Sequence, residues 1–325
     1  MKKILTLLCS CFTAAMLIAT SAEAKVWRVD NNTGTPGDFT TATAAVTSSS
    51  VASGDTLYFN GSATDYGSAT LTKKLVMIGP GYFLNENPET QVVTQTARLS
   101  NIVLNPGSQG SEVMGFEGVS CDIRTSNIVM RRNKDCYAYI GYYISTGVSN
   151  VFVSQNYIYA VYVGSSCTNV FITNNYIFSS GISSSTTAVI HVAQNVINGP
   201  GITTYNSFVY NNIMNSGSVS GTGNSYNNNL CNGTQFAAGN GNVQNVTMTN
   251  VFVGTGSTDG KWKLKAGSPA LGAGINGEEC GMFGGNEPYI LSGLPPIPAI
   301  WSFSQPSIVP ASGTLQIRIK ANAHN

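Results

Sequence analysis

The chain has 325 residues, of which 16 are Lys or Arg and 15 are Asp or Glu. This charged fraction of 10% is well under the roughly 25% of a usual soluble domain, while 42% of the residues are hydrophobic. The apolar content excludes a chain that is disordered through excess charge. The formal net charge of +1 argues against a nucleic-acid partner, because such proteins carry a basic face against the phosphates.

Residues 1–24 are typical of an export signal peptide. Lys2 and Lys3 form a basic start, residues 4–18 an apolar stretch, and residues 22–24 (Ala-Glu-Ala) a small-x-small cleavage site. Cys11 leaves open a second interpretation, a lipoprotein anchor. No other segment has the 18 or more apolar residues of a transmembrane helix. We expect a secreted or outer-surface protein, or a periplasmic one, with no transmembrane segment.

Five cysteines follow this segment, at spacings that fit no zinc motif. They are Cys121, Cys136, Cys167, Cys231 and Cys280. An odd number leaves at least one thiol unpaired. The sequence is compatible with up to two disulfides or with buried single thiols.

A repeat of about 20 residues runs through the middle of the chain. Residues 149–158 and 168–177 match at nearly every position, and weaker copies lie at 127–133, 189–197 and 206–212. An asparagine near the end of each copy defines the register. These residues are Asn133, Asn156, Asn175, Asn195 and Asn212, and we expect the series to continue at Asn229 and Asn250.

The repeat predicts short strands joined by turns, because β-branched runs alternate with Gly, Ser and Asn. A unit of this length fits one coil of a β-solenoid. Strand alternation places Val151 and Val153 of one copy, and Val170 and Ile172 of the next, on the inner face. The recurrent asparagine then lies at a turn, where the amides of successive coils can hydrogen-bond to one another.

With these repeats, the chain resembles the right-handed parallel β-helices of the pectate-lyase-like group. The segments that carry the resemblance are 39–46 (a short capping helix), 54–59 and 73–81 (first coils), 81–87, and 266–274 with 281–285 (a closing segment). The resemblance covers about residues 26–288 and is greatest to secreted bacterial β-helix proteins of unassigned function. It implies an all-β, right-handed parallel β-helix and no single activity.

The expected organisation is a β-helix with its N-terminal cap at 25–288 and a Pro-containing tail at 289–325. Residues 314–320 alternate in character and predict a terminal strand. We expect the tail to cover an open end or one side of the solenoid, since an uncovered edge invites pairing with another chain. A secretion or surface-attachment signal is the alternative.

The central coils lack the side chains that enzymes of this fold need. Residues 136–258 contain no Asp, Glu, Lys or Arg, but 20 Asn and one His. Hydrolases need paired carboxylates, and lyases need carboxylates on Ca²⁺ beside a basic proton acceptor. Neither set can come from this stretch.

Charged residues gather just before the neutral stretch, at 112–135. A Ca²⁺-dependent polysaccharide lyase could use Glu117 and Asp122 to hold the ion and Arg131 or Lys134 as the base. We favour a solvated patch of mutually compensating charges. On this interpretation the protein has no cofactor, and Ca²⁺ enters only with the lyase alternative.

Aromatic residues form the candidate ligand-binding surface. Alignment of the copies predicts an outward stripe and a second outward row; the stripe holds Phe152, Phe171, His191 and Phe208, and the row holds Tyr157 and Tyr176. Neutral sugar rings stack on such aromatic faces, and an exposed apolar row marks a contact surface. His191 has no carboxylate or nucleophile in its own coil, so we do not expect it to be catalytic. Trp301 and Phe303 of the tail could instead cover the stripe.

Taken together, the sequence predicts a non-catalytic, glycan-binding or adhesive protein with a polysaccharide or cell-surface glycan as its partner. The charged patch keeps a carbohydrate-active enzyme as the alternative. A structural envelope or matrix component is the second alternative. The sequence leaves the oligomeric state open.

Overall fold

The computed structural model describes residues 23–35, 37–306 and 314–323. The predicted signal peptide lies outside the described residues except for its last two positions. No helix in the described ranges has the length and apolarity needed to cross a membrane.

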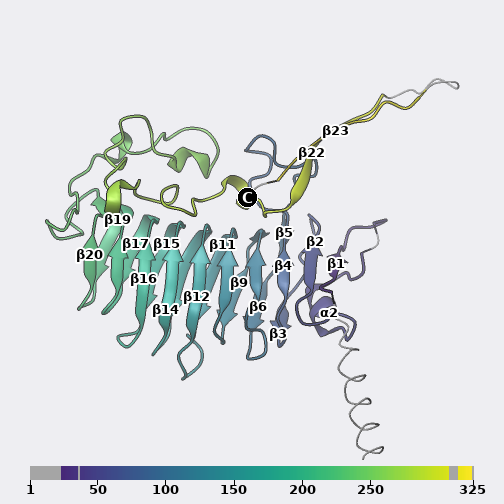
Figure 1. Ribbon diagram of the computed structural model, residues 1–325, viewed down its shortest axis with the longest axis horizontal. Helices are drawn as coiled ribbons and strands as arrows, with labels where there is room; N and C mark the ends of the chain where they lie inside the picture. The colour runs from purple at the N-terminus through teal and green to yellow at the C-terminus, as the bar shows by residue number, and fades with distance from the viewer. Residues whose placement is uncertain (1–22, 36, 307–313, 324–325) are drawn as a thin grey trace, which may run out of the picture.

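The chain forms a parallel β-solenoid of about nine turns, of the right-handed type (Figure 1). This confirms the predicted all-β fold. Parallel pairing of successive coils builds two long sheets. The ten-stranded sheet contains, in spatial order, β1 (Val26–Val29), β2 (Thr56–Phe59), β4 (Val76–Ile78), β7 (Glu112–Met114), β10 (Ile128–Arg131), β12 (Ser149–Ser154), β14 (Thr168–Thr173), β16 (Val189–Ala193), β18 (Phe208–Tyr210) and β20 (Ser225–Asn227).

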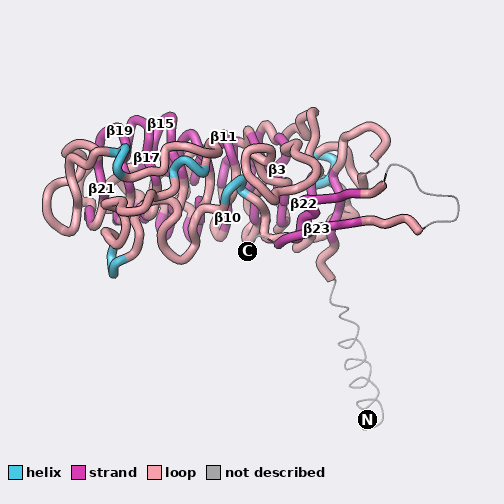
Figure 2. Tube along the Cα trace, turned by 90° about the horizontal axis from the view of Figure 1, so that it is seen from above, coloured by secondary structure: helices cyan, strands magenta, loops and turns pink. Residues whose placement is uncertain are grey.

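The eleven-stranded sheet supplies the other half of each coil. It contains β3 (Ala69–Leu71), β6 (Asn101–Leu104), β9 (Ser120–Ile123), β11 (Lys134–Ile140), β13 (Tyr157–Val163), β15 (Tyr176–Ser184), β17 (Val196–Thr203), β19 (Ile213–Ser220) and β21 (Leu230–Cys231), with β5 (Ala97–Arg98) and β8 (Phe116–Glu117) beside this path. Figure 2 shows the coils stacked along one axis.

The predicted capping helix is present at the N-terminal end as α2 (Ala42–Thr47) (Figure 1). Thr41 is its N-cap, because its side chain accepts a hydrogen bond from the backbone N–H of Ala44 at 3.2 Å. The helix buries Ala42, Ala45 and Val46 against the first coils.

The core is the shared inner face of the two sheets. Val151 pairs with Val170 and Val153 with Ile172, and all four are fully buried, as the alternation predicts. Each such side chain contributes roughly 1.5–3 kcal/mol of transfer free energy. Because both sheets turn their apolar faces inward, their outer faces point away from each other. The five cysteines are also buried and form no disulfide.

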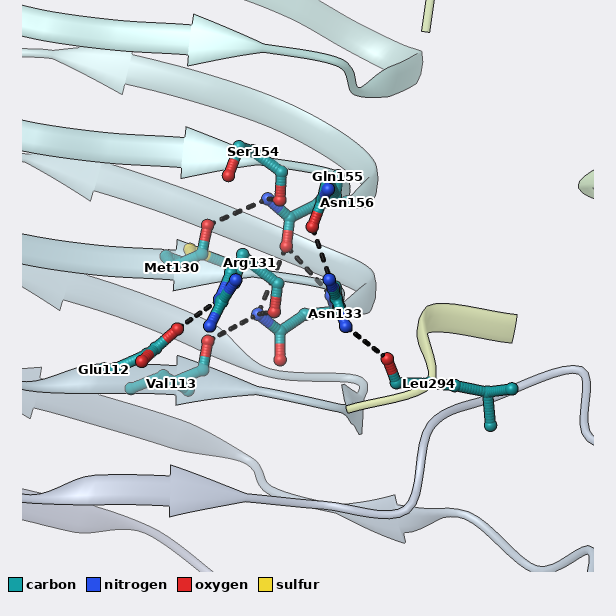
Figure 3. A network of polar contacts seen from close by, with 10 residues as sticks. Glu112, Val113, Met130, Arg131, Asn133, Ser154, Gln155, Asn156 and Leu294 are labelled. Carbon is teal, nitrogen blue, oxygen red and sulfur yellow. Dashed lines mark hydrogen bonds and ion pairs between the residues drawn. The ribbon is translucent and has the colours of Figure 1, made fainter. Parts of the chain in front are cut away.

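Asparagines at the corner between the two sheets form the predicted ladder. Asn156 Oδ1 accepts hydrogen bonds from the backbone N–H of Asn133 at 2.9 Å and from Asn133 Nδ2 at 3.2 Å (Figure 3). The same pair of bonds links each later member to the next through Asn229. The prediction that Asn250 belongs to the ladder is wrong. The ladder ends at Asn242, because the last coil is shortened to 13 residues.

A long segment, residues 246–294, runs back along the side of the solenoid; we call it the covering segment. It holds four short 3₁₀ helices, η1 (Met248–Asn250), η2 (Gly260–Trp262), η3 (Ile275–Gly277) and η4 (Leu291–Gly293). The resemblance implied a closing segment here, and the structure instead places it over the asparagine corner (Figure 1).

The residue before each ladder asparagine fixes the covering segment. These residues adopt left-handed backbone, with φ near +55° at Arg132, Gln155, Asn174, Gln194, Asn211 and Asn228. Their side chains donate to Leu294 O (2.7 Å), Pro288 O (2.8 Å), Gly284 O (2.8 Å), Glu278 Oε2 (3.0 and 3.2 Å) and Ala273 O (2.9 Å) in that order. As the solenoid advances the partner numbers fall, so the covering segment runs antiparallel to the coil axis.

The tail ends in an antiparallel hairpin of β22 (Pro298–Ser304) and β23 (Arg318–Ala323). The terminal strand therefore begins later than the predicted 314–320. The hairpin lies beside the first coils, where Ile300 O accepts a hydrogen bond from Val92 N–H at 2.9 Å (Figure 2). Trp301 and Phe303 are thus near the opposite end of the rod from the aromatic stripe, and these two rings do not cover it.

Candidate functional site

Four rings form one continuous pile on the outer face of the ten-stranded sheet; we call it the aromatic pile. It consists of Phe152 (β12), Phe171 (β14), His191 (β16) and Phe208 (β18), paired in register. The ring centroids are 5.0, 4.7 and 4.9 Å apart in that order, with interplanar angles of 8°, 17° and 16°. The inter-coil spacing of about 4.8 Å favours this stacking, because the rings occupy the same register position in successive coils.

The end rings are the most exposed of the four, and each has a smaller residue of the next coil in register beyond it, Val129 beside Phe152 and Ser225 beside Phe208. Phe152 is 42% exposed and Phe208 is 46% exposed, whereas Phe171 and His191 are half-buried between their neighbours. The two end rings stand three coils apart, roughly 14 Å at the usual strand spacing. The exposed ring edges therefore form one outward ridge, on which the apolar face of a sugar can pack, and this ridge is most open at its two end rings.

A groove of about 460 Å³ lies between the aromatic pile and the covering segment. Its polar lining includes Asn174, Gln194 and Asn211 from the corner and Glu278 and Glu287 from the covering segment. Glu278 accepts hydrogen bonds from Gln194 Nε2 at 3.0 Å and Asn211 Nδ2 at 3.2 Å. No Lys or Arg is among the described residues of this lining. The groove is therefore suited to hydroxyl and amide groups and repels an acidic polymer.

His191 is held as a neutral ring within this surface. Burial between Phe171 and Phe208 lowers the pKa of its imidazole below the usual value. No carboxylate hydrogen-bonds to it among the described residues, so nothing orients it as an acid or base. Its ring serves as part of the aromatic pile.

The structure buries Tyr157 and Tyr176, so they do not form the exposed row that the sequence predicts. They are only 8% and 3% exposed, because the covering segment packs over them. The ring of Trp262 lies 4.6 Å from that of Tyr176, and the ring of Phe83 lies 5.4 Å from that of Tyr157. Burial raises the pKa of Tyr176 to about 12. Both tyrosines belong to the packing beneath the covering segment, and a ligand on the surface cannot reach them.

The charged residues at 112–135 pair with one another. Arg131 forms an ion pair with Glu112 (Figure 3), and Lys134 Nζ lies 3.0 Å from Glu117 Oε1 and 2.5 Å from Asp135 Oδ2. Burial lowers the pKa of Lys134, but hydrogen bonds and charges from Asp135 and Glu117 outweigh it, and the net pKa is raised. A lysine held protonated in this way is unsuited to accept a proton.

Asp122 lies apart from this network and pairs with Arg124 through Oδ2, at 2.5 Å from Nη2. Its other oxygen, Oδ1, is buried and accepts no hydrogen bond within the described part of the chain. Among the described residues, no three His, Cys, Asp or Glu side chains gather closely enough to hold a metal ion. Glu117 and Asp122 do not form a shared cation site with a third ligand.

Six tyrosines form a group on the outer face of the eleven-stranded sheet that was not predicted from the sequence. We call it the tyrosine cluster. Its members are Tyr137 and Tyr139 (β11), Tyr142 and Tyr143 in the following turn, and Tyr159 and Tyr162 (β13). The rings of Tyr139 and Tyr162 stack at 5.3 Å and 10°, and those of Tyr137 and Tyr159 at 5.1 Å and 29°. The sequence signal is a group of tyrosines at most three residues apart in each of two neighbouring coils, within 137–143 and 157–162.

No protein-family model, curated protein or solved structure matches the chain.

Proposed function

We propose that this protein is a non-catalytic glycan-binding or adhesive β-helix of the pectate-lyase-like type, acting when secreted or displayed on the outer surface. The observation that carries the proposal is the aromatic pile, with its two exposed end rings, beside a groove lined by amides and carboxylates. The ligand is a neutral polysaccharide or cell-surface glycan, because the groove lining is polar and holds no positive charge among its described residues.

The rigidity of the site supports binding rather than turnover. Each ring stands on a strand that pairs with both neighbouring coils, and the asparagine ladder fixes the corner next to the groove. A preformed surface loses little conformational entropy on binding. In the charged patch, by contrast, Arg131 and Lys134 are held in ion pairs, which disfavours the lyase alternative.

The test is affinity electrophoresis of the purified protein in gels that contain a neutral polysaccharide (β-glucan, xyloglucan or galactomannan) or polygalacturonate. Retention by a neutral polymer is expected, and Phe152→Ala with Phe208→Ala should weaken it about tenfold or more. Phe303→Ala is the matched control, because this ring is 48% exposed but lies on the hairpin. No retention by any neutral polymer, or retention unchanged in the double variant, would contradict the proposal.

Product analysis in the same samples separates the enzyme alternative. The proposal expects no new unsaturated or reducing ends on polygalacturonate in the presence of Ca²⁺. Cleavage that disappears in Arg131→Ala or Lys134→Ala would instead establish a lyase at the charged patch.

A further inference from the structure

The tyrosine cluster is built as a contact surface rather than as core. Tyr142 is 50% exposed and Tyr143 is 57% exposed, although their rings touch at 5.1 Å and an interplanar angle of 87°. The perpendicular arrangement leaves ring faces of different direction open to solvent. Behind them, Tyr139 lies 5.7 Å from Tyr142 and 5.2 Å from Tyr143, so the two exposed rings rest on a packed layer.

The scaffold holds this surface in one conformation. Tyr139 pairs in register with Tyr162 across neighbouring coils, and their rings stack. Tyrosine is suited to such a surface, because it offers a large amphipathic area and a hydroxyl while losing little rotamer entropy on binding. In the described part of the chain nothing covers the cluster as the covering segment covers Tyr157 and Tyr176.

The charges beside the cluster favour a neutral, hydroxyl-bearing ligand. Asp122 pairs with Arg124, and Asp135 pairs with Lys134, so these four charges beside the cluster compensate one another and do not attract a charged polymer. A surface whose neighbouring charges are compensated favours an uncharged ligand over a carboxylated one.

We propose that the tyrosine cluster is a second binding site for a neutral polysaccharide chain. The aromatic pile lies on the outer face of the ten-stranded sheet and the cluster on the outer face of the eleven-stranded sheet. These faces point away from each other, so one glycan chain bound at each makes the rod a cross-linker. The cross-linking rests on the proposed function of the aromatic pile, whereas the tyrosine site stands on its own geometry.

The experiment compares two surface variants with their combination on the same neutral polymers. Tyr142→Ala with Tyr143→Ala removes exposed turn residues, and Phe152→Ala with Phe208→Ala removes the end rings of the pile. Gel retention measures binding, and light scattering of protein–polymer mixtures measures cross-linking. Circular dichroism of each variant checks the fold, with Phe303→Ala as the matched exposed aromatic.

We expect wild-type protein to raise scattering with a maximum at an intermediate protein-to-polymer ratio, because two sites per rod bridge two chains. Each surface variant should keep retention, weakened about tenfold, and lose the scattering maximum. The combined variant should lose both. This pattern supports two independent sites.

The other outcomes separate the two proposals. If the Tyr142 and Tyr143 variant still cross-links, or if the pile variant alone abolishes retention, the tyrosine site is refuted and the proposed function of the pile stands. If only the tyrosine variant loses retention, the tyrosine site stands and the function of the pile is refuted. No retention of wild-type protein refutes both. A change from dimer to monomer in the tyrosine variant, measured by light scattering without polymer, would assign the cluster to a second copy of the chain and overturn the proposal.

Discussion

Replacing Asn175 by alanine tests whether the asparagine ladder holds the corner of the solenoid. Asn175 is fully buried, and its Oδ1 accepts the backbone N–H of Asn156 at 2.9 Å and Asn156 Nδ2 at 3.0 Å. Its Nδ2 donates to Val153 O at 2.8 Å and to Asn195 Oδ1 at 3.0 Å. The substitution therefore removes four hydrogen bonds at one point inside the protein.

The loss of unfolding free energy depends on which buried groups lose a hydrogen bond that nothing replaces. Asn195 Oδ1 still accepts the backbone N–H of residue 175, and Asn156 Nδ2 still donates to two carbonyls. Two buried groups lose a hydrogen bond to Asn175 that nothing replaces. These are the backbone N–H of Asn156, which donated to Oδ1, and the carbonyl oxygen of Val153, which accepted from Nδ2. Each such group costs about 1–3 kcal/mol. Together with the small cavity, the free energy of unfolding should fall by about 3–5 kcal/mol.

Urea unfolding followed by circular dichroism measures this loss, and Asn250→Ala is the matched control. Asn250 continues the sequence pattern of the ladder, but the structure places it exposed at the end of η1. Its substitution should change the free energy of unfolding by less than about 0.5 kcal/mol. A loss below about 1 kcal/mol for Asn175→Ala, or an equal loss in both variants, would refute the reasoning.

Two further predictions concern buried and partly buried ionisable groups. Asp259 is fully buried and accepts hydrogen bonds from Ser292 N–H at 2.7 Å and from Asn87 Nδ2 at 3.0 Å. Asp259→Asn turns one acceptor into a donor, so it should destabilise the covering segment by about 2–4 kcal/mol and speed proteolysis within it. The exposed Glu86→Gln should do neither, because the amide keeps an oxygen that can accept the backbone N–H of Thr258. Because the pKa of His191 is lowered in the folded protein, the unfolded chain binds the proton of this imidazole more readily. The contribution of His191 to stability is therefore present above pH 6.5 and is lost as the pH falls through the lower folded-state pKa. His191→Phe should flatten the fall in melting temperature between pH 7 and 5, and an unchanged slope would contradict the lowered pKa.

The core and most of the ladder could be predicted because both repeat with the coil. Val151 and Val170 occupy the same place in their coils, so one alignment assigns both. The covering segment has no such period: Gln194 and Glu278 meet although they are 84 residues apart, and only the folded chain brings them together. Asn250 was wrongly predicted to belong to the ladder for a related reason. The final coil is shorter than the others and breaks the spacing on which the prediction depends.

Distance along the coil from the ladder asparagine explains why one predicted aromatic row is open and the other is covered. The rings of the aromatic pile stand four residues before it, in mid-strand, as Phe152 does before Asn156. Tyr157 stands one residue after it, on the corner itself, where the left-handed residues hold the covering segment. Strand alternation correctly predicts that both rows face outward. At the corner, however, the covering segment packs over the outward side chains and buries them. Tyr162, six residues after the same asparagine, lies beyond that segment, and this position joins it to the tyrosine cluster.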